Sequence, residues 1–269
     1  MSNPYKITGP TCISMSGGRT SAFMLRKTLD DCENSLPPDA YVIFANTGKE
    51  RPETLDFVHQ CSVRWGVPIV WVEYVSKLEG GLYREVTYET ASRDGEPFSK
   101  LIEEKKYLPN IALRFCTEYL KVRAIQWAMR QRGHEDYDNL VGLRADEARR
   151  VATVRAKQEP DRCPLYDAGV TEQDVLAFWK SQPFDLQLAR GWSNCDLCFL
   201  KGYPTLLRLE QERPGSAAWW ADKERAIGAT FGRDNVSYRH LQTFASKQTT
   251  LPIFDSSSPS ESLSCACTD

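Results

Sequence analysis

The chain has 269 residues, of which 41% are hydrophobic and 26% are charged. This length and composition suit one or two globular domains with a sizeable core and exclude a disordered protein. The net charge of -2 excludes a general attraction to nucleic acid or to an anionic membrane, so a nucleic-acid partner would need a local basic patch. No apolar run is long enough for a membrane span and no secretory leader follows Met1, so we expect a cytoplasmic protein without membrane contact.

The first motif is the stretch Ser14–Ser21, which reads SMSGGRTS. A short apolar run around Cys12 precedes it and a helical pattern follows it, so we expect a strand, a glycine turn and the start of a helix. Two adjacent glycines let the backbone approach an anion closely, and hydroxyls and helix-start N–H groups can donate to it. The pattern indicates a phosphate cradle, although a Ser-Gly-Gly turn by itself equally fits an ordinary loop.

The next segments repeat the order of strand, turn and helix. Residues 40–45 are almost continuously apolar, 46–50 form a polar turn, Pro52 opens a helix, and 67–74 reads as a third strand. This alternation predicts a doubly wound α/β domain with a mostly parallel sheet. Ligands of such sheets bind beyond the carboxyl ends of the strands, where the two turns would meet.

Residues 79–110 lose this periodicity, and we expect a lid over the site or a plain surface insertion. A helix should follow Cys116. Arg114, Lys121 and Arg123 place positive charge near this thiol, which would lower its pKa or help to hold an anion.

A further strand at 140–144 is expected to end at Arg144. An arginine at a strand end suits bidentate binding of phosphate or sulfate. The alternative is a solvated helix start, in which Asp146 and Glu147 complement the helix dipole.

The nine cysteines are an odd number and fit a complete disulfide framework poorly. Single buried thiols are expected for most of Cys12, Cys32, Cys61 and Cys163. Two close pairs, Cys195 with Cys198 and Cys265 with Cys267, favour metal, iron–sulfur or redox chemistry. The serine-rich tail is expected to be flexible because of its composition. Its two cysteines would take part in such chemistry only if the tail folded back onto another part of the protein.

We therefore divide the chain into three parts. Residues 1–160 form the nucleotide-binding α/β domain, which includes the insertion at 79–110. Residues 161–255 form a smaller helical region that bears cysteines, and 256–269 form the tail.

The order and spacing of these motifs resemble the phosphoadenylylsulfate (PAPS) reductase-like family of the PP-loop ATP pyrophosphatase superfamily. The resemblance covers most of the chain and rests on the motifs Ser16-Gly17-Gly18, Ala45–Gly48, Cys116–Lys121, Gly142–Arg150, Pro164-Leu165 and Cys195–Cys198. It implies a Rossmann-like, mostly parallel sheet of the adenine nucleotide alpha-hydrolase type.

The resemblance also implies a nucleotide site. ATP or a related adenine nucleotide would lie over the first loop, its phosphates held with Mg²⁺ by Ser14, Ser16, Gly17, Gly18, Arg19, Thr20 and Ser21. Adenine and ribose would lie against Ala45, Asn46, Thr47 and Gly48. Arg144 would reach a phosphate or sulfate and take part in catalysis.

Iron–sulfur members of the family carry an adjacent cysteine pair well before a Cys-x-x-Cys. Here Cys116 precedes Cys195 by 79 residues, which agrees with the family, but residue 115 is Phe. The resemblance thus implies a [4Fe-4S] cluster on Cys116, Cys195 and Cys198, with Cys267 or Cys265 as fourth ligand. Cys163, an iron left open to substrate or sulfide, and zinc in place of the cluster are the alternatives.

The intact Ser-Gly-Gly loop favours ATP over a sulfated nucleotide, although Thr20 stands where Asp is usual. The leading hypothesis is a sulfur-transfer enzyme that cleaves ATP to AMP and pyrophosphate and so activates an acceptor such as a nucleobase or nucleic acid. The rival enzyme is a sulfonucleotide reductase, in which Cys265 or Cys267 attacks the sulfate sulfur and a thioredoxin-type reductant releases sulfite. The third hypothesis is a non-catalytic nucleotide or metal sensor. All three hypotheses leave open whether the protein forms homo-oligomers.

Overall fold

The structure is a computed structural model that describes residues 3–77, 81–156, 161–189, 192, 195–232 and 236–247. The strands are β1 (Thr11–Met15), β2 (Ala40–Asn46), β3 (Ile69–Ser76), β4 (Gly81–Val86), β5 (Asp138–Leu140) and β6 (Asp161–Arg162). They form one six-stranded sheet in the order β4-β3-β2-β1-β5-β6, in which β4 alone is antiparallel to its neighbour. The expected α/β fold with a mostly parallel sheet is confirmed.

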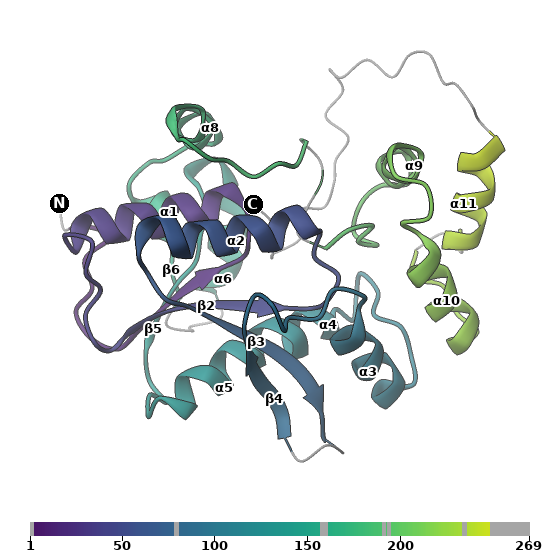
Figure 1. Cartoon of the computed structure of the whole chain (residues 1–269), viewed down its shortest axis with the longest axis horizontal. Coiled ribbons are helices and arrows are strands. Elements are labelled where there is room, and N and C mark those ends of the chain that lie inside the picture. The colour runs from purple at the N-terminus through teal and green to yellow at the C-terminus, as the bar shows by residue number, and fades with distance from the viewer. Residues whose placement is uncertain are drawn as a thin grey trace.

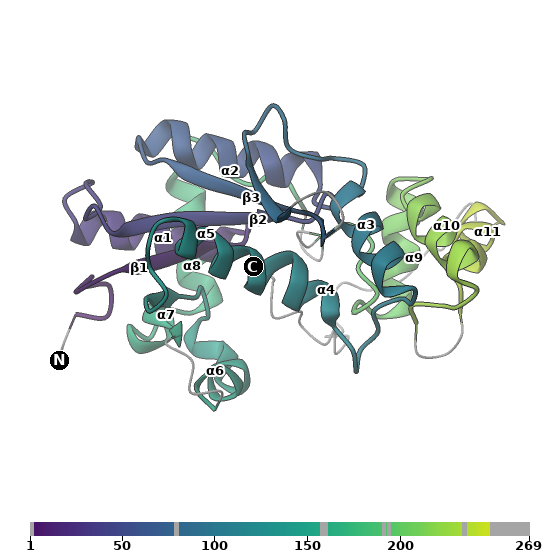
Figure 2. The same cartoon turned by 90° about the horizontal axis from the view of Figure 1, so that it is seen from below.

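Helices cover both faces of this sheet (Figure 1). The first half of the chain supplies α1 (Arg19–Asp31), α2 (Pro52–Trp65), α3 (Glu96–Lys105), α4 (Phe115–Thr117), the π-helix η2 (Glu118–Val122) and α5 (Arg123–Gln131). The second half supplies the 3-10 turn η3 (Ala145–Glu147), α6 (Ala148–Arg155), α7 (Pro164–Asp167), α8 (Glu172–Ser181), α9 (Tyr203–Glu212), α10 (Ala218–Ile227) and α11 (Tyr238–Lys247). Helices α1 and α2 lie on one face and α5 on the other, as Figure 2 also shows. No helix in these described ranges is both long enough and apolar enough to span a bilayer.

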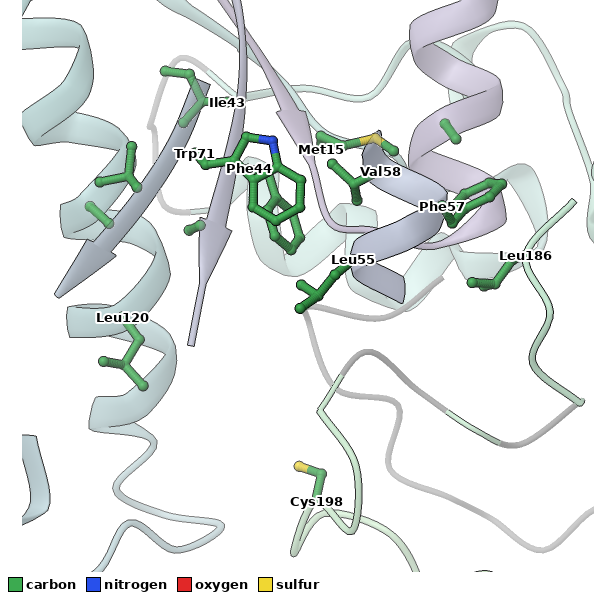
Figure 3. Packing of buried hydrophobic residues seen from close by; sticks show 14 of the residues in the cluster. Met15, Ile43, Phe44, Leu55, Phe57, Val58, Trp71, Leu120, Leu186 and Cys198 are labelled. Atoms are coloured by element: carbon green, nitrogen blue, oxygen red, sulfur yellow. The ribbon is translucent and has the colours of Figure 1, made fainter. Parts of the chain in front are cut away.

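The core lies between the central strands and α2. Figure 3 shows Met15, Phe44 and Trp71 of three neighbouring strands beside Leu55 and Val58 of α2. The rings of Phe44 and Trp71 meet edge to face with centroids 4.8 Å apart. Apolar runs on β1, β2 and β3 are thus buried on both faces, as a parallel sheet between helices requires.

The register brings the ends of the parallel strands to one edge. Met15 at the end of β1 pairs with Phe44 of β2, and Asn46 at the end of β2 pairs with Glu73 of β3. Strand β1 has β2 on one side and β5 on the other, so the chain reverses its winding direction at the end of β1. The loop after β1 therefore lies at the topological switch point, where α/β sheets bind their ligands.

Two expectations about secondary structure are wrong. The segment from 79 to 110 contains an edge strand, β4, and a ten-residue helix, α3, where we expected an aperiodic excursion. Strand β5 ends at Leu140, so Val141–Arg144 is a loop and not the end of a strand. Both errors concern short strands, β4 with six residues and β5 with three, which give little hydrophobic periodicity.

The C-terminal helices α9, α10 and α11 lie at one end of the sheet (Figure 1). Trp220 of α10 is fully buried and stacks on Tyr238 of α11, and its edge meets Phe98 of α3. Most buried hydrophobic residues on both sides of the boundary at 160 belong to one cluster, and a second, smaller cluster of Leu143, Val151 and Cys163 also spans it. The three-part division remains a prediction, and its tail, residues 256–269, lies outside the described residues.

Candidate functional site

The loop after β1 has the geometry of an anion cradle. The backbone N–H of Ser16 donates to Ser21 Oγ over 3.1 Å, and the Ser16 hydroxyl donates to the same oxygen over 2.9 Å. Gly17 has φ of +85°, and a Cβ there would lie 2.5 Å from Thr54 Cγ2 of α2. Helix α1 starts at Arg19 without a side-chain cap on its first N–H groups. Such uncapped groups bind anions, which agrees with the expected phosphate site.

Arg144 meets this loop from the opposite side. Its Nη1 donates to Thr20 Oγ1 over 3.0 Å, and only 9% of the residue is exposed. The Nε of Arg144 donates to Asp146 Oδ1 over 3.1 Å, and its Nη1 lies 3.6 Å from Glu147 Oε2. These two carboxylates fix the orientation of the guanidinium. The two acidic residues open η3, as the helix-start reading expects, and binding of a phosphate or sulfate by Arg144 stays a prediction.

The close approach of the two loops depends on Gly142. A Cβ at this position would lie 3.0 Å from the Cα of Ser21. Because β1 and β5 are neighbours in the sheet, the loop after β5 packs against the backbone of the first turn of α1. Ser14 joins the same two strands, since its hydroxyl donates to Asn139 Oδ1 over 2.7 Å. Ser14 thus bonds within the sheet.

Arg19 points elsewhere. Its guanidinium makes a bidentate ion pair with Asp185, at 2.7 and 2.9 Å. Its backbone oxygen accepts from the indole of Trp179 over 2.9 Å. Arg19 therefore ties the loop after α8 to the start of α1, and its expected contact with a phosphate would require this ion pair to open.

The loop after β2 is held by a buried network. The Asn46 amide donates to Glu73 Oε1 at 2.6 Å and to the Ser92 carbonyl at 2.9 Å, and its oxygen accepts from the Gly48 N–H at 3.2 Å. Glu73, which is wholly buried on β3, also accepts from Ser92 and Arg84. The side chain of Asn46 thus shapes the turn, while Ala45 and Thr47 flank it as buried residues.

The cysteine loop lies directly against this turn. Glu50 and Cys195 form a backbone bridge, and the N–H of Asp196 donates to the Lys49 carbonyl over 2.8 Å. The Lys49 ammonium pairs with the Asp196 carboxylate at 3.0 Å, and the Trp220 indole donates to that carboxylate at 2.9 Å. Two loops 145 residues apart in the chain are therefore joined at one edge of the sheet.

The side chains at this junction include a thiol, a hydroxyl and a carboxylate. Cys195 Sγ lies 3.7 Å from Thr47 Oγ1 and 3.9 Å from Glu50 Oε1. Burial raises the pKa of Glu50, while the nearby charge of Lys121 and hydrogen bonds from Thr47 act in the opposite direction. Lys49, Glu50 and Asp196 were not identified from the sequence. For Lys49 and Glu50 the signal that could have found them is the run of polar residues directly after the buried strand β2, which the structure keeps buried.

Cys116 lies on a third element. It is half-buried in the single turn α4, directly before the π-helix η2, and π-helical turns are frequent at functional sites. The positive charge expected around it is partly neutralised, because Arg123 pairs with Glu118 and stacks on Tyr119. A hydrogen bond from Lys105 lowers the pKa of the Tyr119 hydroxyl.

The cysteines expected to bind a metal are not all brought together. Cys198 is buried on the loop that follows Cys195, and Figure 3 shows it beyond the end of α2 that carries Leu55. Within the described ranges, no three side chains of His, Cys, Asp or Glu are arranged to hold a metal ion. Cys265 and Cys267 lie outside the described residues. The set of Cys116, Cys195, Cys198 and Cys267 therefore stays a prediction.

Three isolated thiols are buried away from the site. Burial raises the pKa of Cys12 from 9.0 to about 12 and that of Cys163 to about 11. It raises the pKa of Cys61 as well. A rise of this size lowers the thiolate fraction of Cys12 about a thousandfold.

We expect iodoacetamide to label Cys116 and Cys195 in the folded protein at mildly alkaline pH, and to label Cys12, Cys61 and Cys163 at least about 100-fold more slowly. Peptide mapping by mass spectrometry measures the rates, with urea-unfolded protein as the control in which all of them react. Rapid labelling of Cys12 or Cys61 before unfolding would contradict the burial of these thiols.

Comparison with known proteins adds two related sequences and one solved structure. No family model matches the chain. The nin region protein ORF290 of Escherichia phage lambda, itself uncharacterised, is 32% identical over 198 residues, which are 70% of this chain and 65% of the phage protein. An uncharacterised protein of Methanocaldococcus jannaschii is 22% identical over 222 residues, 79% of this chain and 41% of that protein. The chain thus spans less than two thirds of the length of either relative.

The solved structure is that of the U34-tRNA thiolase NcsA from Methanococcus maripaludis with its [4Fe-4S] cluster. It superposes on this chain with a TM-score of 0.44 and 13% sequence identity, over 85% of this chain and 76% of the thiolase.

Proposed function

We propose that this chain is an adenine-nucleotide-dependent sulfur-transfer enzyme with a metal centre bound by thiolates. The observation that carries the proposal is the junction of the loop after β2 with the cysteine loop, at the edge of the sheet where the loop after β1 also lies. A nucleotide in the anion cradle and a metal centre on Cys195 would be neighbours there. The sequence resemblance points to the same pair of ligands.

The residues of the cradle suit cleavage of ATP between the α and β phosphates. The first N–H groups of α1 and the Ser16 hydroxyl would hold the phosphates, and Arg144 would neutralise the charge that develops on them. Mg²⁺ bound with the nucleotide would supply further charge for the departing pyrophosphate. The AMP group would pass to an oxygen of the acceptor, for which we propose a nucleobase or nucleic acid.

The proposed metal centre is assigned to the cysteines at and near this junction. The Cys195 thiol donates to the buried Glu50 carboxylate over 3.9 Å, so it lies at the junction itself. Cys116, Cys195 and Cys198 would hold the centre, a [4Fe-4S] cluster or zinc. A cluster would supply a site that binds and delivers sulfur.

The test is release of pyrophosphate from ATP and Mg²⁺ by anaerobically purified protein. Ser16→Ala should lower the release about 10- to 100-fold, because it removes a hydrogen bond to a charged phosphate. Ser35→Ala, in the exposed loop that follows α1, is the control and should leave the rate unchanged.

Other outcomes would overturn the proposal in favour of its rivals. Sulfite release from a sulfated nucleotide in the presence of thioredoxin would identify a reductase. Tight nucleotide binding without pyrophosphate release, with every acceptor supplied, would identify a sensor.

A further inference from the structure

Residues 105–123 carry an excess of positive charge, in a chain whose net charge is -2. The stretch holds five lysine or arginine residues and one acidic residue, Glu118. Glu118 pairs with Arg123, whereas no ion pair in the part of the chain that the structure describes includes Lys106 or Arg114. The stretch therefore has the local positive charge that a nucleic-acid partner requires.

The same stretch exposes large apolar side chains. Leu113 is 57% exposed, Tyr107 42% and Val122 40%. The other large hydrophobic residues this exposed, in the described ranges, lie apart from one another on α2, on α8 and before α11: Val63, Leu176 and Val236. Exposed apolar side chains that gather in one place beside cations mark an interaction surface.

Contacts between α3 and η2 bring the two ends of the stretch together. Helices α3 and α4 lie side by side (Figures 1 and 2). Lys105 Nζ lies 3.9 Å from the centre of the Tyr119 ring, and the guanidinium carbon of Arg123 lies 4.2 Å from it. The Tyr107 ring meets the buried Phe115 ring edge to face at 4.9 Å, which anchors it at the surface. We call this patch of cations and exposed apolar side chains the 105–123 surface.

Lys106 occupies a backbone position that suits glycine. It is the C-cap of α3, with φ of 60° and ψ of 21° in the left-handed region. Glycine adopts this conformation without the cost that a Cβ brings. The Lys106 side chain makes no ion pair, hydrogen bond or ring contact with the described residues. Binding of an external anion by its ammonium group would offset the backbone cost.

The 105–123 surface adjoins the candidate site. Cys116 lies within it, half-buried between Arg114 and Lys121 in the sequence. Burial has the largest effect on the pKa of Glu50 and raises it, and the charge of Lys121 comes next and lowers it. Lys121 is therefore close to the junction of the loop after β2 with the cysteine loop. A molecule bound on this surface would have one end at that junction.

We propose that the 105–123 surface binds a single-stranded segment of a nucleic acid and so presents the acceptor to the site. Lys106 and Arg114 would contact phosphates, and a base would stack on the exposed ring of Tyr107. A single strand is required because the bases of a duplex stack on one another and leave no face for an aromatic ring. This inference rests on the proposed function, which gives the reason for an acceptor beside Cys116, and it names the surface that holds this acceptor.

The experiment measures binding of fluorescein-labelled RNA and DNA single strands of mixed sequence by fluorescence anisotropy, without ATP and at several salt concentrations. The RNA duplex of the same sequence and phosphatidylserine vesicles are the competing ligands. The full-length variants are Lys106→Gly, Arg114→Gln and Tyr107→Leu. Lys180→Gln, at an exposed position on α8, is the control, because α8 packs against α1 through the rings of Phe178 and Phe23.

We expect the native chain to bind at least one of the two single strands at least about 10-fold more tightly than the duplex. Lys106→Gly and Arg114→Gln should each weaken this binding by up to about 10-fold and reduce the slope of log affinity against log salt by about 0.7. Tyr107→Leu should weaken it about 10-fold or more with the slope unchanged, because stacking involves no counterion. The unfolding temperature of Lys106→Gly should not fall, since glycine suits the left-handed position, so its weaker binding cannot come from unfolding.

Native affinity in all three surface variants would overturn the proposal, as would an equal loss in Lys180→Gln. Equal binding of duplex and single strands, or tighter binding of the vesicles than of any strand, would overturn it too. Pyrophosphate release is scored separately. Strand binding that depends on these residues in a chain that releases no pyrophosphate would support the surface and refute the proposed function. Pyrophosphate release without strand binding would do the reverse.

Discussion

Replacing Gly17 with alanine is expected to abolish nucleotide binding and to destabilise the fold. The residue has φ of +85°, a conformation that disfavours any residue with a Cβ by about 1–2 kcal/mol. The added methyl group would also lie 2.5 Å from Thr54 Cγ2 and 3.3 Å from the Phe44 ring, so overpacking should add about 1–3 kcal/mol. Relief of the clash would move the loop away from α2 and distort the cradle. Urea denaturation and calorimetric titration with ATP measure the two effects.

Gly133→Ala is the control for this prediction. Gly133 has φ of +84°, but no atom lies within 4 Å of the position that its Cβ would take. Only the unfavourable backbone conformation should therefore lower the free energy of unfolding of this variant, by about 1–2 kcal/mol. The variant should bind ATP as the native chain does. Equal losses of stability in the two variants would show that Gly17 does not pack against α2 as described.

Glu73→Gln should be the most destabilising of the conservative substitutions at the sheet edge. The carboxylate accepts from Asn46, Arg84 and twice from Ser92, and its side chain is wholly buried. In an amide one of the two oxygens becomes an NH2 group, so buried donors lose their acceptor, and we expect a loss of about 1–3 kcal/mol in the free energy of unfolding. Because Asn46 orients Gly48, ATP affinity should fall as well.

Glu85→Gln on the adjacent strand provides the comparison. Glu85 lies on β4 and makes one ion pair with Arg132, with 45% of its side chain exposed. Removal of such a surface ion pair should change stability by less than about 1 kcal/mol and leave ATP binding unaltered. A similar loss in both variants would contradict the role of the buried network around Glu73.

Local patterns in the sequence were sufficient to predict the centre of the fold. The apolar runs of β1, β2 and β3 and the caps of the helices between them are properties of consecutive residues, so their order could be read directly. The short edge strand β4 was missed because only one of its six residues, Tyr83, is buried. Such a strand forms because it pairs with β3, and no pattern within its own residues predicts that pairing.

The candidate site was predicted less completely than the fold. The sequence pointed to the Ser-Gly-Gly loop and to Arg144, and the structure brings Arg144 to Thr20. It also assigned Arg19 to a phosphate, whereas the structure pairs this residue with Asp185, 166 positions away. An arginine beside a glycine loop gives no local indication of which distant carboxylate will reach it.

The sequence by itself determined the alternation of strands and helices, the glycine turn after the first strand and the presence of a Cys-x-x-Cys. Each of these depends on residues within a few positions of one another, through backbone propensity and hydrophobic periodicity. Only the tertiary structure decided that Glu50 faces Cys195 and that Glu73 holds Asn46. These contacts depend on which strands and loops become neighbours, and that choice is set by burial over the whole chain.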